Sequence, residues 1–315
     1  MNNAKGKIIS HKGKNPPLKH SGLRADTFLP YGFIKIEKGD TNHYIKRGFE
    51  DFLLSSNFLT PGGDTPLPDM AEPLKFGRGT TFRIFIKGIG YVIVRRYRHG
   101  GLFGKVFRDR YFFGHRALEE LFCLTTASIR GVPVPEALGV SERRRRFWFI
   151  PSPFYTALIA TTEIADSINL PVFLNGVDDT KLRGEVLLRA GAAIKKMHDA
   201  GIHHKDLNMN NLLVKTGEDA IFIIDFDRAK IFPLLTDRLR LRSLKRLLRS
   251  VRKLARLGDI NDKNINDNDF LHILTGYAGD NTALIGRLKR KTLYSKTIKF
   301  RSLFGQMRDG LLPKK

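Results

Sequence analysis

A polar segment at residues 203–214, HHKDLNMNNLLV, carries side chains that could serve phosphate chemistry. Asp206 can accept a proton from a substrate hydroxyl, and Asn211, five residues later, can bind a cation through its amide oxygen. A second cation ligand is expected at the end of a neighbouring strand, where Asp225 closes an apolar run. Mg²⁺ prefers such oxygen ligands and also takes phosphate oxygens. The spacing therefore predicts Asp206 as the catalytic base, with Asn211 and Asp225 as magnesium ligands.

The order of these residues resembles the catalytic loop of protein kinases, H-R-D-x-x-x-x-N, followed by D-F-G. In this chain the two segments read HKDLNMNN at residues 204–211 and DFD at 225–227. Two short apolar runs, NLLV and AIFIID, lie between them and are joined by the turn KTGEDA, which predicts a β-hairpin. We interpret His204 as a structural residue that bonds to backbone near the loop. An ordinary turn residue at Asp206 and a strand-end cap at Asp225 are the plainer alternatives.

Two further elements would be needed to hold the phosphates of a nucleotide. The segment GRGTTF at residues 77–82 offers the backbone N–H groups of Gly77, Gly79 and Thr80 to phosphate oxygens, although the third glycine of the usual kinase pattern is missing. A cation should reach the phosphates from the third strand of the sheet. Arg95 occupies the place of the lysine in the kinase pattern V-A-I-K, and a plain exposed arginine is the alternative there.

A helix carboxylate should pair with this cation. Glu119 and Glu120 both lie on the following helical segment, and we favour Glu120 as the partner of Arg95. The nucleotide base is expected to lie against backbone groups near Glu163 and Ile164. A solvated helix carboxylate is the alternative interpretation of Glu120.

The first half of the chain predicts a small antiparallel sheet with one helix. Alternating apolar residues followed by the turn KGIG and the run YVIVRRY predict a β-hairpin within residues 75–97. Residues 111–131 have helical character and end at a glycine before VPVPE. Residues 146–151 and 157–164 predict two more strands.

The second half is predicted to be mainly helical, which makes the fold class α+β. Residues 181–201 and 238–258 predict helices on either side of the polar loop and hairpin, and residues 258–269 predict a polar break. The predicted domains are a flexible basic tail (1–27), a kinase N-lobe (28–163), a C-lobe with the catalytic loop and a basic amphipathic helix (164–257), and a basic C-terminal extension (258–315).

The composition points to an anionic partner. The net charge is +24, which suits nucleic acid, an acidic membrane surface or a phosphorylated ligand. The single cysteine excludes an intramolecular disulfide framework and fits a reducing compartment. No apolar run approaches the ~18 residues of a membrane-spanning helix, and the basic N-terminal segment lacks the apolar core of a secretory signal. We expect a protein that is soluble or peripheral to a membrane.

The predicted helix at residues 238–256 has two interpretations. It carries about nine basic side chains beside an apolar stripe, as a helix at a membrane interface does. The other interpretation is that its leucines pack inside the domain and its arginines are solvated, and the two interpretations are compatible.

Several motifs together resemble the bacterial 3-deoxy-D-manno-octulosonic acid (Kdo) kinases of lipopolysaccharide assembly. The most specific are DLN at residues 206–208 and IDFDRA at 224–229. GRGTTF (77–82), RRYRHGG (95–101), YFF (111–113) and GVPVPEAL (131–138) also match that family, in the same order. The resemblance covers roughly residues 31–256, and residues beyond 258 find no match.

The resemblance implies a protein-kinase-like two-lobed fold, with a small antiparallel-sheet N-lobe and a mainly helical C-lobe. It implies ATP-dependent phosphorylation of the 4-hydroxyl of Kdo on a lipid A precursor, with ATP and Mg²⁺ as cofactors. The partners would be this Kdo-lipid and the anionic surface of the inner membrane, where the protein is peripheral on the cytoplasmic face. Matching positions imply Asp206 as base, Asn211 and Asp225 as Mg²⁺ ligands, and Arg95 with Glu120 as the phosphate-orienting pair.

Two other functions compete with this one. A kinase of a core heptose, another lipopolysaccharide sugar, ranks second because those enzymes differ at the DLN and DFD positions. A noncatalytic pseudokinase that binds RNA or membranes would also use the basic surface. The complete set Asp206, Asn211 and Asp225 disfavours it, so we expect no nucleic-acid partner. The sequence makes no prediction of oligomeric state.

Overall fold

The computed structural model describes residues 8–9, 29–55, 71–74, 81–97, 111–112, 115–144, 146–147, 150–152, 154–218, 220–257 and 265–294. The chain divides into two compact units, a sheet unit and a helical unit. The sheet unit comprises Met1–Arg130, Val134–Ala165 and Phe226–Lys230. The helical unit comprises Gly131–Pro133, Asp166–Asp225 and Ile231–Lys315. The main division follows Ala165, close to the boundary expected after residue 163, and the DFD segment is shared between the units.

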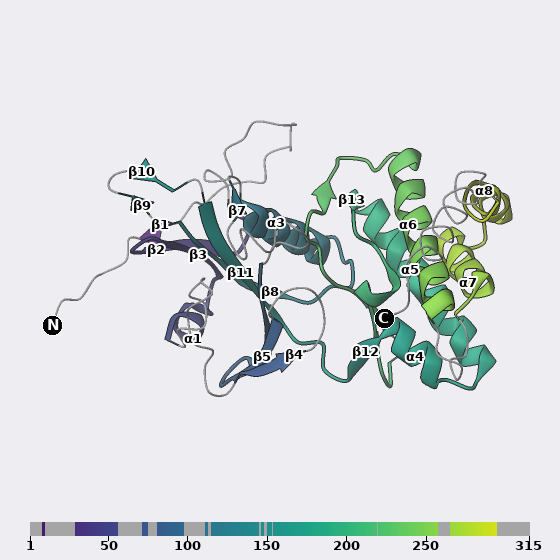
Figure 1. The fold of residues 1–315 in the computed structure, drawn as a ribbon, viewed down its shortest axis with the longest axis horizontal. Helices are drawn as coiled ribbons and strands as arrows, with labels where there is room; N and C mark the ends of the chain where they lie inside the picture. The colour runs from purple at the N-terminus through teal and green to yellow at the C-terminus, as the bar shows by residue number, and fades with distance from the viewer. Residues whose placement is uncertain are drawn as a thin grey trace, which may run out of the picture. The chain divides into compact units, whose positions relative to one another are not determined.

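The sheet unit is built on one antiparallel sheet (Figure 1). Its strands are β1 (Ile8–Ile9), β2 (Phe33–Lys38), β3 (Thr41–Lys46), β4 (Glu72–Leu74), β5 (Thr81–Ile86), β6 (Gly90–Arg96), β7 (Tyr111–Phe112), β8 (Ala137–Arg143) and β11 (Phe154–Thr162). The order is β1-β2-β3-β8-β11-β6-β5-β4, and β7 pairs with the first residues of β11. Two residues of the predicted flexible tail, Ile8 and Ile9, thus form a strand that pairs with β2.

The predicted hairpin is confirmed as β5 and β6. Phe82, Ile84 and Ile86 are buried and alternate with more exposed neighbours, because successive side chains of a strand point to opposite faces. These three side chains join the core of the sheet unit. The strand predicted at 157–164 is also confirmed, as β11, which begins earlier, at Phe154.

The strand predicted at 146–151 is confirmed at its two ends, as β9 (Arg146–Phe147) and β10 (Ile150–Pro151). These two short strands pair with each other in a separate two-stranded sheet. The strand that follows the helix in the main sheet is β8, between β3 and β11. Its sequence ALGVSER has polar residues where a buried strand is expected to be apolar. Tertiary partners offset their burial: the Ser141 hydroxyl lies 2.7 Å from the ring Nδ1 of His43 on β3.

Helix α3 (Arg116–Ile129) contacts β8 and β11. It begins five residues after the predicted start at residue 111, because Tyr111 and Phe112 form strand β7 instead. The side chains of Leu118, Leu121 and Leu124 are buried at the spacing of a helix face. A short helix, α1 (Glu50–Ser55), contacts β3 of the same unit.

The helical unit contains the second half of the predicted elements, which confirms the α+β class. Its helices are α4 (Leu170–Gly176), α5 (Thr180–Asp199), α6 (Asp237–Leu257), α7 (Asp267–Ala278) and α8 (Thr282–Thr292), with a 3₁₀ turn η2 (Met209–Asn211). Its strands are β12 (Ser167–Asn169), β13 (Ile202–His203), β14 (Leu212–Lys215) and β15 (Ala220–Ile223), followed in the chain by β16 (Lys230–Ile231). The predicted hairpin is confirmed as β14 and β15, and β12 adds a third strand.

Helices α5 and α7 approach each other closely through two glycines. A Cβ at Gly191 would overlap the backbone of α7 at Ile273, and a Cβ at Gly276 would overlap the backbone of α5 at Leu188. The polar break predicted at 258–269 is wrong for its last residues, because Asn266 caps α7 in a capping box with Asp269. Residues assigned to a C-terminal extension therefore form part of the core of this unit.

Helix α6 packs its apolar side chains inward. Leu244, Leu247, Leu248 and Val251 are fully buried, while six of the basic residues of the helix are exposed. Of the two interpretations of this helix, the structure supports the one in which the leucines belong to the domain core. Among the described helices, none combines the length and apolar character that crossing a bilayer requires.

Candidate active site

The loop that carries Asp206 is held by side-chain amides. The carbonyl of Asp206 accepts hydrogen bonds from Nδ2 of Asn208 (2.7 Å) and Nδ2 of Asn211 (3.1 Å). Oδ1 of Asn208 also accepts from the N–H of Asn210 (2.9 Å), so Asn208 caps the turn η2. These bonds fix the backbone at Asp206, and a fixed backbone is what the positioning of a catalytic group requires.

His204 joins this loop to the strand end that carries the second candidate ligand. It is fully buried, and its Nε2 lies 3.1 Å from the carbonyl oxygen of Ile224, the residue before Asp225. Burial lowers the pKa of His204, and the Ile224 carbonyl and the carboxylates of Asp225 and Asp206 oppose that shift. The ring is therefore neutral and donates from Nε2 to the carbonyl. This confirms the prediction that His204 is a structural residue.

Asn211 and Asp225 stand at the same end of the β14–β15 hairpin. The N–H of Ile224 donates to the carbonyl of Asn211 (3.0 Å). Because Nδ2 of Asn211 is bonded to the Asp206 carbonyl, Oδ1 is the amide atom available for a cation. Asp225 is exposed and has a φ of 62°, a left-handed conformation that aspartate tolerates better than most residues and that recurs at functional sites.

The two oxygen donors fit Mg²⁺. This ion is usually bound through one or two protein oxygens and fills its octahedron with water and substrate phosphates. Within the described ranges, no group of three His, Cys, Asp or Glu side chains could hold a metal ion. By that preference, a cation at Asn211 and Asp225 would take its remaining ligands from phosphate oxygens and water.

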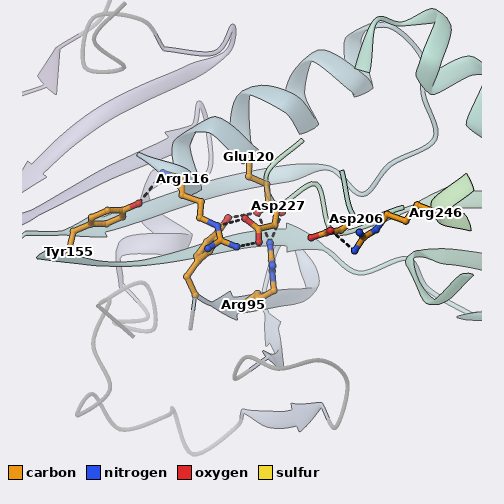
Figure 2. Close-up of polar contacts among 8 residues, drawn as sticks. Arg95, Arg116, Glu120, Tyr155, Asp206, Asp227 and Arg246 are labelled. Carbon is orange, nitrogen blue, oxygen red and sulfur yellow. Dashed lines mark hydrogen bonds and ion pairs between the residues drawn. The ribbon is translucent and has the colours of Figure 1, made fainter. Parts of the chain in front are cut away.

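The carboxylate of Asp206 has a cationic neighbour on α6. Its Oδ1 lies 2.6 Å from a terminal nitrogen of Arg246, and both side chains remain accessible to solvent (Figure 2). No sequence pattern indicated this pairing, because Arg246 is far from the loop in the chain. We call Asp206, Asn211, Asp225 and Arg246 the loop group.

In the sheet unit, Arg95 of β6 pairs with Glu120 of α3 (Figure 2). Nη2 of Arg95 lies 2.6 Å from Oε1 and 2.5 Å from Oε2 of Glu120, whose side chain is 3% exposed. Glu119 is exposed, so the structure places Glu120 and not Glu119 against Arg95. Burial and then the charge of Glu120 raise the pKa of Tyr97 well above its ordinary value. The hydroxyl of Tyr97 therefore stays protonated and donates to Glu120.

A second ion pair on α3 involves the last residue of the DFD segment. Nε and Nη2 of Arg116 donate to the two carboxylate oxygens of Asp227, a bidentate geometry. The N–H of Arg116 donates to the hydroxyl of Tyr155 (3.0 Å), which ties the start of α3 to β11. Arg116 and Glu120 are four residues apart and therefore share one face of the helix. We call Arg95, Tyr97, Arg116, Glu120 and Asp227 the sheet-unit cluster.

Glu163, expected near the nucleotide base, is already engaged in the sheet unit. Its carboxylate accepts two bonds from Arg83 (2.8 and 2.9 Å), and its N–H donates to the carbonyl of Tyr91 (2.9 Å). The guanidinium of Arg83 lies 3.4 Å from the centre of the Tyr91 ring. The carboxylate and the N–H of Glu163 are thus occupied within the sheet unit, and a contact with a nucleotide base through the backbone near Glu163 and Ile164 stays a prediction. Gly77, Gly79 and Thr80 lie outside the described residues.

Sequence reasoning singled out neither Arg116 nor Tyr97. Arg116 could have been found from its helical spacing of four residues to Glu120. Asp227 was recognised as part of DFD, but the sequence did not indicate its partner, Arg116. Arg246 could not be found, because only the packing of α6 brings it to the loop.

The fold and these residues define a protein-kinase-like phosphotransferase. The antiparallel sheet is followed by a helix whose carboxylate pairs with a strand cation, and a helical unit then carries the HKDLNMNN loop and the Asp225 strand end. Residues 71–277 match the model of the "Lipopolysaccharide kinase (Kdo/WaaP) family". The chain belongs to this family, and it is a phosphotransferase of lipopolysaccharide core biosynthesis with an alcohol group as acceptor.

Individual relatives are also similar. A 3-deoxy-D-manno-octulosonic acid kinase of Vibrio vulnificus (strain YJ016) is 34% identical over 205 residues, which is 64% of this chain and 80% of that protein. The enzyme of the same name from Pasteurella multocida (strain Pm70) is 31% identical over 209 residues, 64% of this chain and 82% of that protein. A solved structure titled "WaaP in complex with acyl carrier protein" is 21% identical, with a TM-score of 0.47 over 71% of this chain and 88% of that one.

Proposed function

We propose that the chain transfers the γ-phosphoryl group of ATP to the 4-hydroxyl of Kdo on a Kdo-lipid A precursor. The observation that carries the proposal is the fixed Asp206 loop, in which two amides hold the backbone and leave a carboxylate accessible to a substrate hydroxyl. The acceptor is supported by the relatives named as 3-deoxy-D-manno-octulosonic acid kinases.

Asp206 would act as the general base. The Kdo 4-hydroxyl oxygen forms a bond to the γ-phosphorus, the bond from that phosphorus to the β-γ bridging oxygen breaks, and ADP leaves. The hydroxyl proton passes to the Asp206 carboxylate. Bound Mg²⁺, held by Asn211 and Asp225, would neutralise charge on the phosphate oxygens. A positioned base of this kind contributes about 10²–10⁴-fold to the rate.

The sheet unit would orient the nucleotide. Arg95, fixed by Glu120, is assigned to the phosphates, and the segment carrying Gly77, Gly79 and Thr80 to the same phosphates through its backbone N–H groups. The carbonyl of Glu163 and the backbone of Ile164 are assigned to the base.

We place the protein at the cytoplasmic face of the inner membrane as a peripheral protein. The acceptor is an amphipathic lipid that is held in that membrane, and a net charge of +24 is attracted to an anionic lipid surface. Because the leucines of α6 are buried, this helix would meet such a surface through its basic side chains.

The test is mass spectrometry of a Kdo-lipid A precursor after incubation with the purified chain, ATP and Mg²⁺. We expect a gain of one phosphate, located on the 4-position of Kdo by fragmentation. The matched control is the same lipid without Kdo, which should gain nothing. An unchanged Kdo-lipid would refute the proposal, and a phosphate found only on a heptose-bearing acceptor would replace it with a heptose kinase.

A further inference from the structure

After its first residue, the exposed acidic Asp237, helix α6 presents a single basic face. From Arg238 to Arg256, every exposed residue of this helix is basic, and these are Arg238, Arg242, Arg246, Arg249, Lys253 and Arg256. They follow one another at intervals of three or four residues, which confines them to a sector of about 80° on an α-helix. The opposite side carries the fully buried leucines. We call these six residues the α6 basic face.

Carboxylates pair with two of the basic residues beside this face, but most of the face itself has no carboxylate partner among the described residues. Arg240 pairs with Asp199 (2.7 Å) and Arg252 pairs with Asp267 (2.6 Å), and both arginines are partly buried. Among the described residues, no carboxylate pairs with Arg238, Arg242, Lys253 or Arg256. Concentrated, uncompensated positive charge on a rigid helix is a surface for a polyanion.

The α6 basic face reaches the catalytic loop at one point. Arg246, a member of the face, contacts the carboxylate of Asp206 (2.6 Å). One turn further along the helix, the hydroxyl of Ser250 accepts a hydrogen bond from the N–H of Met209, which lies in the loop (3.1 Å). The face therefore meets the candidate base at Arg246 and extends along α6 on both sides of it.

We propose that the α6 basic face binds the anionic headgroup of the acceptor lipid and that Arg246 is a positioning residue for Asp206. The inference rests on the proposed function, because that acceptor carries phosphates and a carboxylate in addition to the hydroxyl that reacts. Residues on either side of Arg246 bind these groups, and Arg246 orients the Asp206 carboxylate toward the hydroxyl. The two roles predict different kinetic effects.

The experiment measures kcat and KM for the Kdo-lipid in micelles of neutral detergent. Arg242→Gln together with Lys253→Gln should raise the acceptor KM about tenfold and leave kcat nearly unchanged, since the loss of two positive charges near anionic groups weakens binding by about this factor. Arg287→Gln together with Arg290→Gln is the matched control, because both residues are exposed on α8 and remove the same charge from the same unit. The control should change KM less than about twofold, because its residues lie outside the α6 basic face.

Arg246→Met should lower kcat on the order of 100-fold with a smaller change in KM, because a misplaced catalytic group loses rate rather than binding. Arg246→Lys keeps the charge and should recover part of this loss. A purely structural role for Arg246 would lower the melting temperature and would leave the kcat of the folded fraction unchanged, which would refute the positioning role.

The experiments distinguish a failure of the proposed function from a failure of the inference about the α6 basic face. If the wild-type chain does not phosphorylate the lipid, the proposed function and this inference both fall. If it does, and the Arg242 and Lys253 variant shows the KM of the α8 control, only the inference is overturned. The inference is also overturned if that variant loses only its sedimentation with anionic vesicles, or only its binding to RNA, because the face would then serve another polyanion.

Discussion

The sheet-unit cluster and the loop group both contain arginine–carboxylate pairs. They differ in how many of the carboxylate oxygens accept hydrogen bonds from the protein. In the sheet-unit cluster, both oxygens of Glu120 and both oxygens of Asp227 accept bonds from arginine, and Glu120 also accepts from Tyr97. In the loop group, Asp206 receives one arginine contact and remains accessible to solvent.

This difference indicates a structural role for the sheet-unit cluster and a catalytic role for the loop group. A satisfied, poorly accessible ion pair fixes the geometry of the elements that carry it, and the removal of one partner leaves a charge without compensation. An accessible carboxylate on a fixed backbone keeps lone pairs for a substrate. Substitutions in the loop group should therefore reduce activity more than stability, whereas substitutions in the sheet-unit cluster should reduce both.

The largest effect is expected at Asp206. Asp206→Ala should lower kcat by about 10³-fold, within the range of a lost general base. The affinity for ATP, measured by calorimetry, and the melting temperature should stay near the wild-type values, because the backbone carbonyl that anchors the loop remains. Near-normal turnover in this variant would remove Asp206 from its assigned role.

Glu120→Gln tests the sheet-unit cluster. Loss of the charge that faces Arg95 and Tyr97 should lower the free energy of unfolding by about 3 kcal/mol, as for a broken buried pair. It should also lower kcat/KM for ATP on the order of 100-fold through loss of orientation. Glu119→Gln is the control, since Glu119 is the exposed neighbour. Equal effects of the two substitutions would contradict the distinction between them.

A smaller effect is expected at the Arg116–Asp227 pair. Asp227→Asn should cost about 2 kcal/mol of unfolding free energy, because it weakens a bidentate charge-assisted contact. In a double-mutant cycle with Arg116→Met, the two losses should overlap by about 1–2 kcal/mol. Chemical denaturation of the four proteins measures this coupling. Additive losses would show that the pair does not act as a unit.

The smallest effect concerns a buried histidine outside both groups. Nδ1 of His198 lies 2.9 Å from the hydroxyl of Tyr277, which also accepts from Arg240 (3.3 Å). The imidazole is neutral at pH 7, because the pKa of His198 lies well below its ordinary value. Burial and then the charge of Arg240 lower the pKa of His198 to about 3, from 6.5 in an unfolded chain.

The sign of the pH effect follows from these values. Below pH 6.5 the unfolded chain gains a proton at this position and the folded chain does not, so stability is lost as the pH falls from 6.5 toward 3. His198→Phe removes this contribution. We compare the free energy of unfolding of the wild type with that of the variant. For each pH unit below about 6, this free energy should fall by about 1 kcal/mol more in the wild type than in the variant. Denaturant titrations at about pH 7, 6 and 5 measure it, and parallel curves would contradict the assignment.

Local sequence patterns predicted the elements in which apolar side chains are buried and polar side chains are exposed. The β5–β6 hairpin, helix α5 and the β14–β15 hairpin follow from alternation, helical period and turn residues, and all three are present. The prediction failed at β8, where polar residues are buried against partners from other strands. It also failed at the start of α7, where the end of a polar stretch forms a helix cap.

The same division holds for the site. Asp206, Asn211 and Asp225 could be singled out because phosphoryl transfer requires these residue types within a short distance along the chain. Arg246 and Asp227 could not be given partners, because their contacts come from segments far away in the sequence. The tertiary structure also placed the leucines of α6 in the domain core, since amphipathic spacing describes a helix face but not what covers it.

The sequence by itself determined the order of most elements and the chemistry of the loop, because both depend on neighbours within one or two turns. Only the fold determined which charges meet, as in the pairing of Arg246 with Asp206 and of Arg116 with Asp227. Ion pairs depend on distances between segments that no local pattern records.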